Sequence, residues 1–462
     1  MAVIAIACPA AWPQKGVLNM LHQRAPRPLL GKVLMMFLLP ALLLGTFTAQ
    51  RLKSSPAAAL SSEEEPVQQE LGMIQWPQNL NAVRYEVEIF PADKTSPDPQ
   101  KPAPQAVYRN EQVFTSNLLL PEQQFAQERK QNIPLLWRVR AFDLDGNPIT
   151  PYSQPQSLTQ SWRKVDRDAP LPRPSATKGN ATVLLYPVYA YTGNPGAEKY
   201  EVEVTDRYPE NPEGYLTSRY RVYAEETVLT DLYDAEPRIG EFYWRVRGMD
   251  KNGRPVGIWS EPQKITNNPD KKWVAGIYGD SISHGGGHLS FSPVDYAYSY
   301  GHYLNFPVIN LSQSGDTSEM MVDRFDQDVT PFHIQYLLIM GGSNSLRAGV
   351  PAEDVIADLK TLQQKARERG IMPILLTLPP INPANIQKAF DEPTDENWQA
   401  AFAEVNRFIR TQPHIDVAAP FEAMGDELPT NLALDGIHGD WNMKKIMGRV
   451  INQHIGEFKP LS

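Results

Sequence analysis

Four short polar segments in the C-terminal part of the chain contain the residue types that acyl transfer needs. They are Gly279-Asp280-Ser281-Ile282, Ser314-Gly315-Asp316, Gly341-Gly342-Ser343-Asn344 and Asp435-Gly436-Ile437-His438. Each of the first three follows a run of apolar residues. Together the segments supply a hydroxyl, a glycine N–H, a side-chain amide and an Asp–His pair, which is a full set for nucleophilic acyl transfer.

Ser281 is the candidate nucleophile. A serine hydroxyl attacks an ester poorly until an imidazole accepts its proton, and His438 would accept that proton and later return it to the leaving alcohol. Asp435, three residues before His438, would fix the imidazole tautomer and stabilise the protonated ring. The sequence therefore predicts a catalytic triad of Ser281, Asp435 and His438.

The same segments offer donors for an oxyanion hole. A tetrahedral intermediate needs preorganised N–H groups where its negative charge develops, and each such donor lowers the barrier by about 2.7–4 kcal/mol. The backbone N–H groups of Ser281 and Gly315 and the amide of Asn344 are the candidates.

The elements around these segments predict how they meet. Short apolar runs alternate with helical patterns after Trp273, which predicts a mostly parallel, doubly wound sheet. Right-handed crossovers place the carboxyl ends of such strands at one edge, where the four segments can converge. We expect strands at 274–278, 308–311, 336–340, 373–378 and 415–418, and helices at 351–369, 395–411 and 441–458.

In this order, the four segments resemble the sequence blocks of the GDSL/SGNH hydrolases, over residues 272–460. The resemblance implies a flavodoxin-like α/β domain with a five-stranded, mostly parallel sheet, which we assign to 269–462. It also implies hydrolysis of esters or thioesters without a metal or other cofactor, and the triad and oxyanion roles given above. The chain departs from the family at Ile282, where Leu is usual, and at Ser345, where Asp is common. Neither change removes a catalytic group.

Three further residues near the nucleophile have less specific signals. His284 and His288 directly follow Ser281, and we assign them a possible place in the substrate cleft. Their spacing of four is typical of metal ligands, but the three glycines between them disfavour a helix that would face both toward one ion. No metal site is therefore predicted. We interpret Asp280 as structural.

An internal repeat precedes the α/β domain. The motif Tyr-Glu-Val-Glu at Tyr85 returns at Tyr200, and Trp-Arg-Val-Arg at Trp137 returns at Trp244. Alternating apolar and polar residues, with Asp-Gly or Asn-Gly turns after the second motif, predict two antiparallel β-sandwiches at 72–166 and 167–268. Both resemble fibronectin type III domains. We interpret the arginines of the second motif as solvated residues at alternate positions of a strand.

The N-terminal segment predicts a membrane anchor. Residues 33–49 carry no charge and 29–49 is long enough to span a bilayer, with a basic stretch at 1–28 before it and a polar, flexible stalk at 50–71 after it. The basic bias places the N-terminus in the cytoplasm and the catalytic domain outside. A cleaved signal peptide, which would give a secreted protein, is the alternative.

Composition excludes other classes of protein. The net charge is −9, and residues 1–53 contain six of the 44 Lys and Arg but none of the 53 Asp and Glu. The rest of the chain is therefore acidic and unsuited to nucleic acid, which needs a basic face. Cys8 is the only cysteine, so an intrachain disulfide is excluded.

These observations favour a membrane-anchored, extracytoplasmic serine esterase. An acyl ester is the expected partner and acetylated carbohydrate the preferred substrate, a preference that comes from family analogy. The alternatives are an O-acyltransferase acting on a cell-envelope polymer, a lipase or thioesterase, and a non-catalytic surface binding protein.

Overall fold

The computed structural model describes residues 65–79, 81–92, 97–173, 184–285 and 299–461. The predicted basic tail, anchor and most of the stalk lie outside the described residues. Within the described ranges, no helix has the length and apolar character needed to cross a membrane.

The first β-domain consists of two antiparallel sheets with a shared core. One sheet has the order β4-β1-β7 and the other β3-β2-β5-β6. Trp76, Trp137 and Phe125 are the large side chains of the core between them. The strands are β1 (Leu71–Gln75), β2 (Arg84–Pro91), β3 (Tyr108–Val113), β4 (Asn117–Pro121), β5 (Leu135–Phe142), β6 (Gln156–Ser157) and β7 (Arg163–Val165), with short helices η1 (Glu122–Phe125), α2 (Ala126–Lys130) and α3 (Leu158–Ser161).

The second β-domain repeats this plan. Its sheets have the orders β12-β9-β8 and β11-β10-β13-β14, and β15 also pairs with β13. Two antiparallel sandwiches are thus confirmed, and the tight turns are confirmed by left-handed Gly146 and Gly253. The likeness to fibronectin type III domains stays a prediction. The strands are β8 (Leu171–Pro172), β9 (Val188–Thr192), β10 (Lys199–Thr205), β11 (Arg221–Thr227), β12 (Asp231–Tyr233), β13 (Gly240–Met249), β14 (Pro255–Val256) and β15 (Gln263–Asn267).

The repeated charged residues form cross-strand ion pairs at matching positions of the two domains. Glu88 lies opposite Arg138 in the first domain, and Glu203 lies opposite Arg245 in the second. The Arg138 Nε donates to the glutamate at 2.5 Å and the Arg245 Nε at 2.6 Å, and both arginines are only 1% exposed. The sequence motifs therefore mark a buried electrostatic contact within each sandwich.

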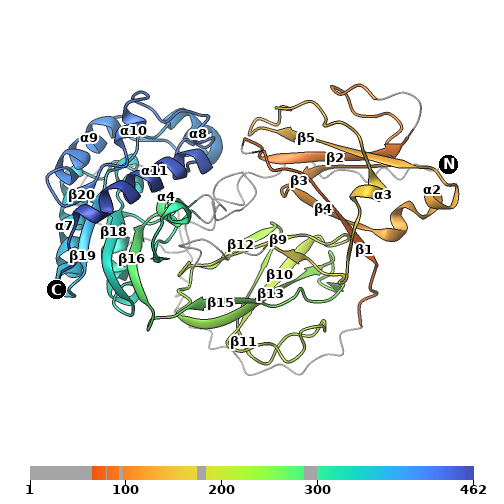
Figure 1. Ribbon diagram of the computed structural model, residues 1–462, viewed down its shortest axis with the longest axis horizontal. Coiled ribbons are helices and arrows are strands. Elements are labelled where there is room, and N and C mark those ends of the chain that lie inside the picture. The colour runs from red at the N-terminus through yellow and green to blue at the C-terminus, as the bar shows by residue number, and fades with distance from the viewer. Residues whose placement is uncertain (1–64, 80, 93–96, 174–183, 286–298, 462) are drawn as a thin grey trace, which may run out of the picture. The chain divides into compact units, whose positions relative to one another are not determined.

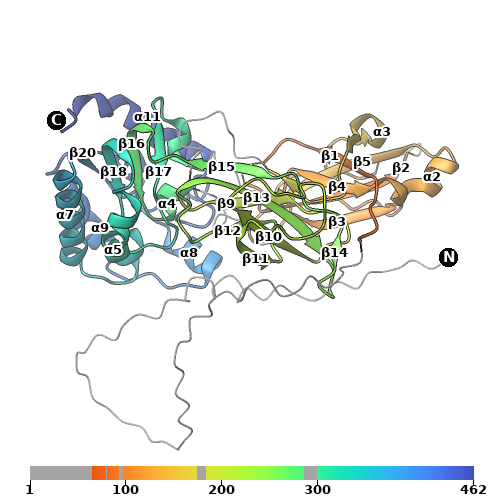
Figure 2. The same cartoon turned by 90° about the horizontal axis from the view of Figure 1, so that it is seen from below.

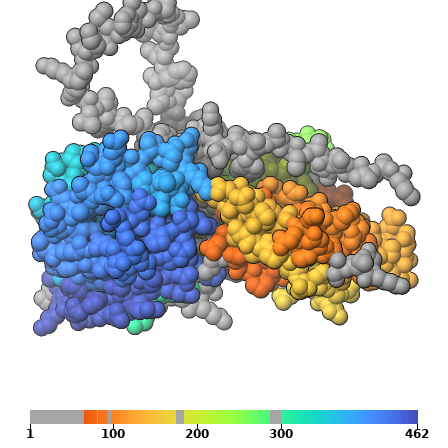
Figure 3. Space-filling view, turned by 90° about the horizontal axis from the view of Figure 1, so that it is seen from above, coloured from red at the N-terminus to blue at the C-terminus, as the bar shows by residue number. Residues whose placement is uncertain are grey.

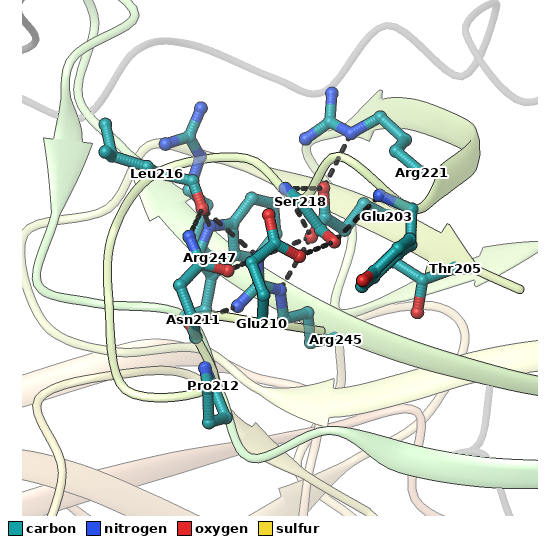
Figure 4. A network of polar contacts seen from close by, with 12 residues as sticks. Glu203, Thr205, Glu210, Asn211, Pro212, Leu216, Ser218, Arg221, Arg245 and Arg247 are labelled. Atoms are coloured by element: carbon teal, nitrogen blue, oxygen red, sulfur yellow. Dashed lines mark hydrogen bonds and ion pairs between the residues drawn. The ribbon is translucent and has the colours of Figure 1, made fainter. Parts of the chain in front are cut away.

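Our interpretation of these arginines as solvated is therefore wrong. Loops cover this face of each domain and present backbone carbonyls to the guanidinium groups. Arg138 donates to the carbonyls of Asp98 and Lys101, and Arg245 donates to those of Asn211 and Leu216. Figure 4 shows the network of the second domain, in which Glu203 contacts Arg221 and Arg245.

The C-terminal domain contains a fully parallel five-stranded sheet. Its order is β17-β16-β18-β19-β20, so the chain moves from β16 to one neighbour and then crosses to the other side. This is the flavodoxin-like order, which confirms the predicted fold class of this domain. The strands are β16 (Lys272–Gly279), β17 (Val308–Asn310), β18 (His333–Met340), β19 (Met372–Leu376) and β20 (His414–Ile415).

Helices cover both faces of this sheet and bury its apolar strands. Figure 2 shows α5 and α7 on one side of the sheet and α11 on the other, and Figure 1 shows α4 near the end of β16. In Figure 3 the C-terminal residues, coloured blue, form a continuous surface. The helices are α4 (Ser281–His284), η3 (Tyr300–Tyr303), α5 (Ser318–Asp328), α6 (Ser343–Arg347), α7 (Ala352–Glu368), α8 (Pro383–Phe390), α9 (Trp398–Ile409), α10 (Ala419–Glu422), α11 (Trp441–His454) and η4 (Ile455–Glu457).

The buried pair in the second β-domain generates a stability prediction. Glu203→Ala leaves the Arg245 guanidinium buried without its charge partner, and we expect a loss of about 3–5 kcal/mol in the free energy of unfolding. Glu226→Ala removes an ion pair with Lys199 whose glutamate is 52% exposed, and it should cost no more than about 1 kcal/mol. Urea unfolding followed by tryptophan fluorescence measures both variants. Equal midpoints would contradict a structural role for the buried pair.

Candidate active site

The turn from β16 into α4 positions Ser281. Asp280 caps the helix, because its carboxylate accepts the Ile282 N–H at 2.9 Å. Gly279 ends the strand where a Cβ would lie only 2.2 Å from the carbonyl oxygen of Met340. Ser281 is therefore the first residue after a sharp turn at the carboxyl edge of the sheet, and it is 7% exposed.

The structure brings the three predicted triad residues into direct contact. The Nε2 of His438 lies 2.8 Å from the Oγ of Ser281, and its Nδ1 lies 2.8 Å from Oδ2 of Asp435. Both distances are those of hydrogen bonds in a nucleophile–base–orienter chain. With Nδ1 protonated toward the carboxylate, Nε2 is free to accept the serine proton.

The tight turn between Asp435 and His438 is held by hydrogen bonds from backbone N–H groups to the Asp435 carboxylate. The Oδ1 of Asp435 accepts the N–H groups of Ile437 at 3.0 Å and His438 at 2.7 Å. Gly436 has a φ of +82°, and a Cβ there would lie 2.3 Å from the Asn382 carbonyl oxygen. One carboxylate thus shapes the turn with one oxygen and orients the imidazole with the other.

The predicted oxyanion donors are connected to each other at the same edge. The loop after β17 is tied to the end of β16, since the Gln313 N–H donates to the Gly279 carbonyl at 3.1 Å. The Asn344 amide donates to the Asp316 carbonyl at 2.9 Å, next to Gly315, whose φ of +87° favours glycine. Their joint role as an oxyanion hole stays a prediction.

Arg324 holds this loop, and the sequence analysis did not identify it. Its guanidinium contacts the carboxylates of Asp316 and Asp328 and donates to the carbonyls of Leu311 and Gly279. One side chain from α5, which is 9% exposed, therefore joins the loop that carries Gly315 to the strand that leads to Ser281. No motif signals this role, because Arg324 belongs to an ordinary amphipathic helix.

Lys444 is a second buried cation that the sequence analysis missed. It is 1% exposed, and its ammonium donates to the Ile282 carbonyl in the nucleophile helix. Burial lowers the pKa of Lys444 to about 8, although Asp280 and Asp435 favour its charged form. Burial also raises the pKa of Asp280 to about 6. The triad therefore lies beside a buried amine, that of Lys444, and a buried carboxyl group, that of Asp280.

The structure places His284 away from the predicted substrate-cleft role. Its side chain is fully buried at the end of α4, and its Nε2 lies 2.7 Å from the Tyr186 carbonyl oxygen. Burial lowers the pKa of His284 to about 4, so the ring is neutral at pH 7. Nε2 is then the protonated nitrogen that donates to the carbonyl. His288 lies outside the described residues.

Comparison with known protein families identifies the domain that contains these residues. Residues 277–440 match the sequence profile of the GDSL-like Lipase/Acylhydrolase family, so the C-terminal part of the chain is a GDSL-like lipase/acylhydrolase domain, as predicted. The β-domains lie outside this match. No curated protein matches the chain.

Several solved structures align with about 40% of the chain. A GDSL-like lipase from Bacteroides thetaiotaomicron is 20% identical, with 40% of this chain and 87% of that chain covered and a TM-score of 0.31. A lipase/acylhydrolase from Enterococcus faecalis is 20% identical, with 41% and 98% covered and a TM-score of 0.32. A mutant of an acetyl-xylooligosaccharide esterase from Geobacillus is 21% identical, with 40% and 94% covered and a TM-score of 0.30.

The buried lysine generates a prediction about pH. Because the pKa of Lys444 falls from 10.5 to about 8 on folding, the unfolded chain binds more protons between these values. The contribution of Lys444 to the free energy of unfolding should therefore rise by roughly 3 kcal/mol from pH 8 to 10.5. We expect the stability difference between the unsubstituted chain and Lys444→Met to change by this amount across the window.

Urea unfolding at several pH values measures this difference. Lys445→Met is the matched control, because Lys445 is the exposed neighbour of Lys444 on α11 and the substitution is chemically the same. A pH-independent stability difference for Lys444→Met would show that the buried ammonium is not titrating in this range.

Proposed function

We propose that the C-terminal domain is a serine esterase that hydrolyses carboxylic esters through Ser281, His438 and Asp435. The observation that carries this proposal is the continuous pair of hydrogen bonds, each 2.8 Å long, from the hydroxyl of Ser281 through His438 to the carboxylate of Asp435. A histidine with only a structural role would not require hydrogen bonds to both a serine hydroxyl and a carboxylate.

The geometry supports a two-step mechanism. In the first step the Oγ of Ser281 attacks the ester carbonyl while the Nε2 of His438 accepts its proton, and the imidazolium then protonates the departing alcohol. In the second step His438 takes a proton from water, which attacks the acyl-enzyme; the imidazolium then returns the proton to the Oγ of Ser281 as the acid is released. Asp435 stabilises the imidazolium in both steps without itself taking up the proton.

The proposed oxyanion hole uses backbone as well as side-chain donors. The N–H groups of Ser281 and Gly315 and the Nδ2 of Asn344 would bind the developing negative charge. The amide of Asn344 is oriented by two contacts, since its Oδ1 accepts the Arg347 Nε at 3.2 Å and its Nδ2 donates to Asp316. Nδ2 has a second hydrogen, which is available for the oxyanion.

We propose acetylated carbohydrate as the substrate class and a membrane-anchored, extracytoplasmic location. The support for the substrate is analogy with the family to which the C-terminal domain is matched. The support for the location is the uncharged run at 33–49 after a basic segment.

The nucleophile assignment predicts the effect of Ser281→Ala. Loss of the hydroxyl should lower kcat on p-nitrophenyl acetate by at least roughly 10³-fold, because the covalent step is lost. Ser283→Ala is the matched control on the same helix; its Oγ accepts from the Tyr300 hydroxyl, and we expect a change of only a few fold. Turnover of Ser281→Ala at the level of this control would refute the assignment.

The substrate assignment predicts selectivity for a short acyl group on a sugar. The full chain in detergent should release acetate from an acetylated oligosaccharide, and Ser281→Ala should release none above the uncatalysed rate. Acetate release is measured directly. Faster hydrolysis of long-chain p-nitrophenyl esters together with no acetate release would instead indicate a lipase.

A further inference from the structure

A short segment of the second β-domain joins the sheet of the α/β domain. The Leu185 N–H donates to the Asn310 carbonyl at 2.9 Å, and Leu184 forms a parallel bridge with Asn310 on the edge strand β17. Leu185 and Tyr186 belong to the hydrophobic core of the α/β domain, where they are 0% and 2% exposed. The core that carries the active site therefore includes residues on the N-terminal side of β9.

Tyr186 in this segment contacts the helix of the nucleophile and the helix that holds the oxyanion loop. Its carbonyl accepts the Nε2–H of His284 at 2.7 Å, at the last residue of α4. Its hydroxyl donates to Asp328 at 2.7 Å, and Asp328 is an ion-pair partner of Arg324. Both contacts are buried, so they hold their partners in defined positions.

Tyr233, at the end of β12, contacts the oxyanion loop itself. Its hydroxyl oxygen accepts the Ser314 N–H at 3.1 Å, at the residue directly before Gly315. Its ring meets the His284 ring edge-on, with centroids 5.3 Å apart and an interplanar angle of 89°. One tyrosine thus contacts both the loop and the end of the nucleophile helix.

The second β-domain holds these two tyrosines rigidly. β12 pairs with β9, and Tyr233 lies opposite Val188, two residues after Tyr186. The 184–186 segment is fixed by further bonds, since the Asn267 amide donates to the Leu184 carbonyl and the Arg238 N–H donates to the Leu185 carbonyl. The positions of Tyr186 and Tyr233 are therefore set by the sandwich.

We propose that the second β-domain positions the active site, with Tyr233 fixing the oxyanion loop and the Tyr186–His284 contact fixing the nucleophile helix. These are positioning residues, and the proposal rests on the proposed esterase function. Donors stabilise an oxyanion only if they are held in place before the reaction, and a misplacement of about 1 Å can cost as much as roughly 10²-fold in rate.

The test is Tyr233→Phe in the full chain. Phenylalanine keeps the ring against His284 but removes the acceptor of the Ser314 N–H, so we expect kcat on p-nitrophenyl acetate to fall on the order of 10-fold with KM nearly unchanged. Tyr223→Phe is the control: the Tyr223 hydroxyl contacts Glu225 within the same domain, and its kcat should stay within about twofold. A kcat for Tyr233→Phe equal to that of the control would overturn the proposal.

A second pair of variants tests the helix contact. His284→Leu removes the donor to the Tyr186 carbonyl, whereas His284→Gln keeps an N–H near the place of Nε2. We expect a loss of kcat in His284→Leu and its partial recovery in His284→Gln. Rates are expressed per site that reacts with a fluorophosphonate probe, so unfolded protein does not count. Equal rates per site for both variants and the unsubstituted chain would contradict the proposal.

The two proposals fail in different ways. If the unsubstituted chain neither hydrolyses p-nitrophenyl acetate nor reacts with the probe, the esterase function is refuted. If it does both and Tyr233→Phe reacts with the probe and turns over as fast as the unsubstituted chain, the esterase function stands and the positioning role is refuted. Slower phosphonylation of Tyr233→Phe, parallel to its lower kcat, supports positioning, because the phosphonyl oxygen occupies the oxyanion hole.

Discussion

The contact between His438 and Ser281 joins residues that are 157 positions apart, and the rest of the site serves to hold it. It exists only if the end of β16 and the turn before α11 reach the same edge of the sheet. Parallel pairing of β16 with both β17 and β18 provides that edge. After β16 the chain forms β17 on one side of this strand and then β18 on the other. Doubly wound sheets form their binding sites at such a switch point, outside the carboxyl ends of the strands.

Charged side chains behind this edge form hydrogen bonds with polar groups of its loops that would otherwise need water as their partner. Arg324 satisfies two carbonyls and two carboxylates, and Lys444 satisfies the carbonyl of Ile282. Desolvation makes such buried ions costly, and they are therefore a poor source of stability in themselves. Their value is geometric, because the hydrogen bonds of these buried cations hold the loops of the site in one arrangement.

Local patterns predicted the α/β domain, because its buried strands are easily recognised, and they singled out Ser281, Asp435 and His438, which the structure brings into contact. The oxyanion roles of Gly315 and Asn344 stay predictions. Helix α7 lies at 352–368, within the predicted 351–369, while α5 was missed because its apolar face is interrupted by charged residues. Arg324, Lys444 and the buried state of Arg138 could not be predicted. Each depends on a partner that is distant in sequence, and a side chain's spacing says nothing about which loop will cover it.

The two β-domains differ in how they contact the α/β domain: the first meets its surface through the ion pair of Asp145 with Lys388, whereas the second contributes residues to its core. Both keep the buried Glu–Arg pair, which their own sandwich needs. β12 ends in Tyr233, whereas β4, which takes the equivalent place beside β1, reads Asn-Leu-Leu-Leu-Pro and has no tyrosine. The hydroxyl that reaches Ser314 is therefore not required by the sandwich fold. The domain boundary predicted at residue 269 would also separate Leu185 and Tyr186 from the hydrophobic core to which they belong. The second β-domain and the α/β domain are thus better regarded as one structural unit that carries the site.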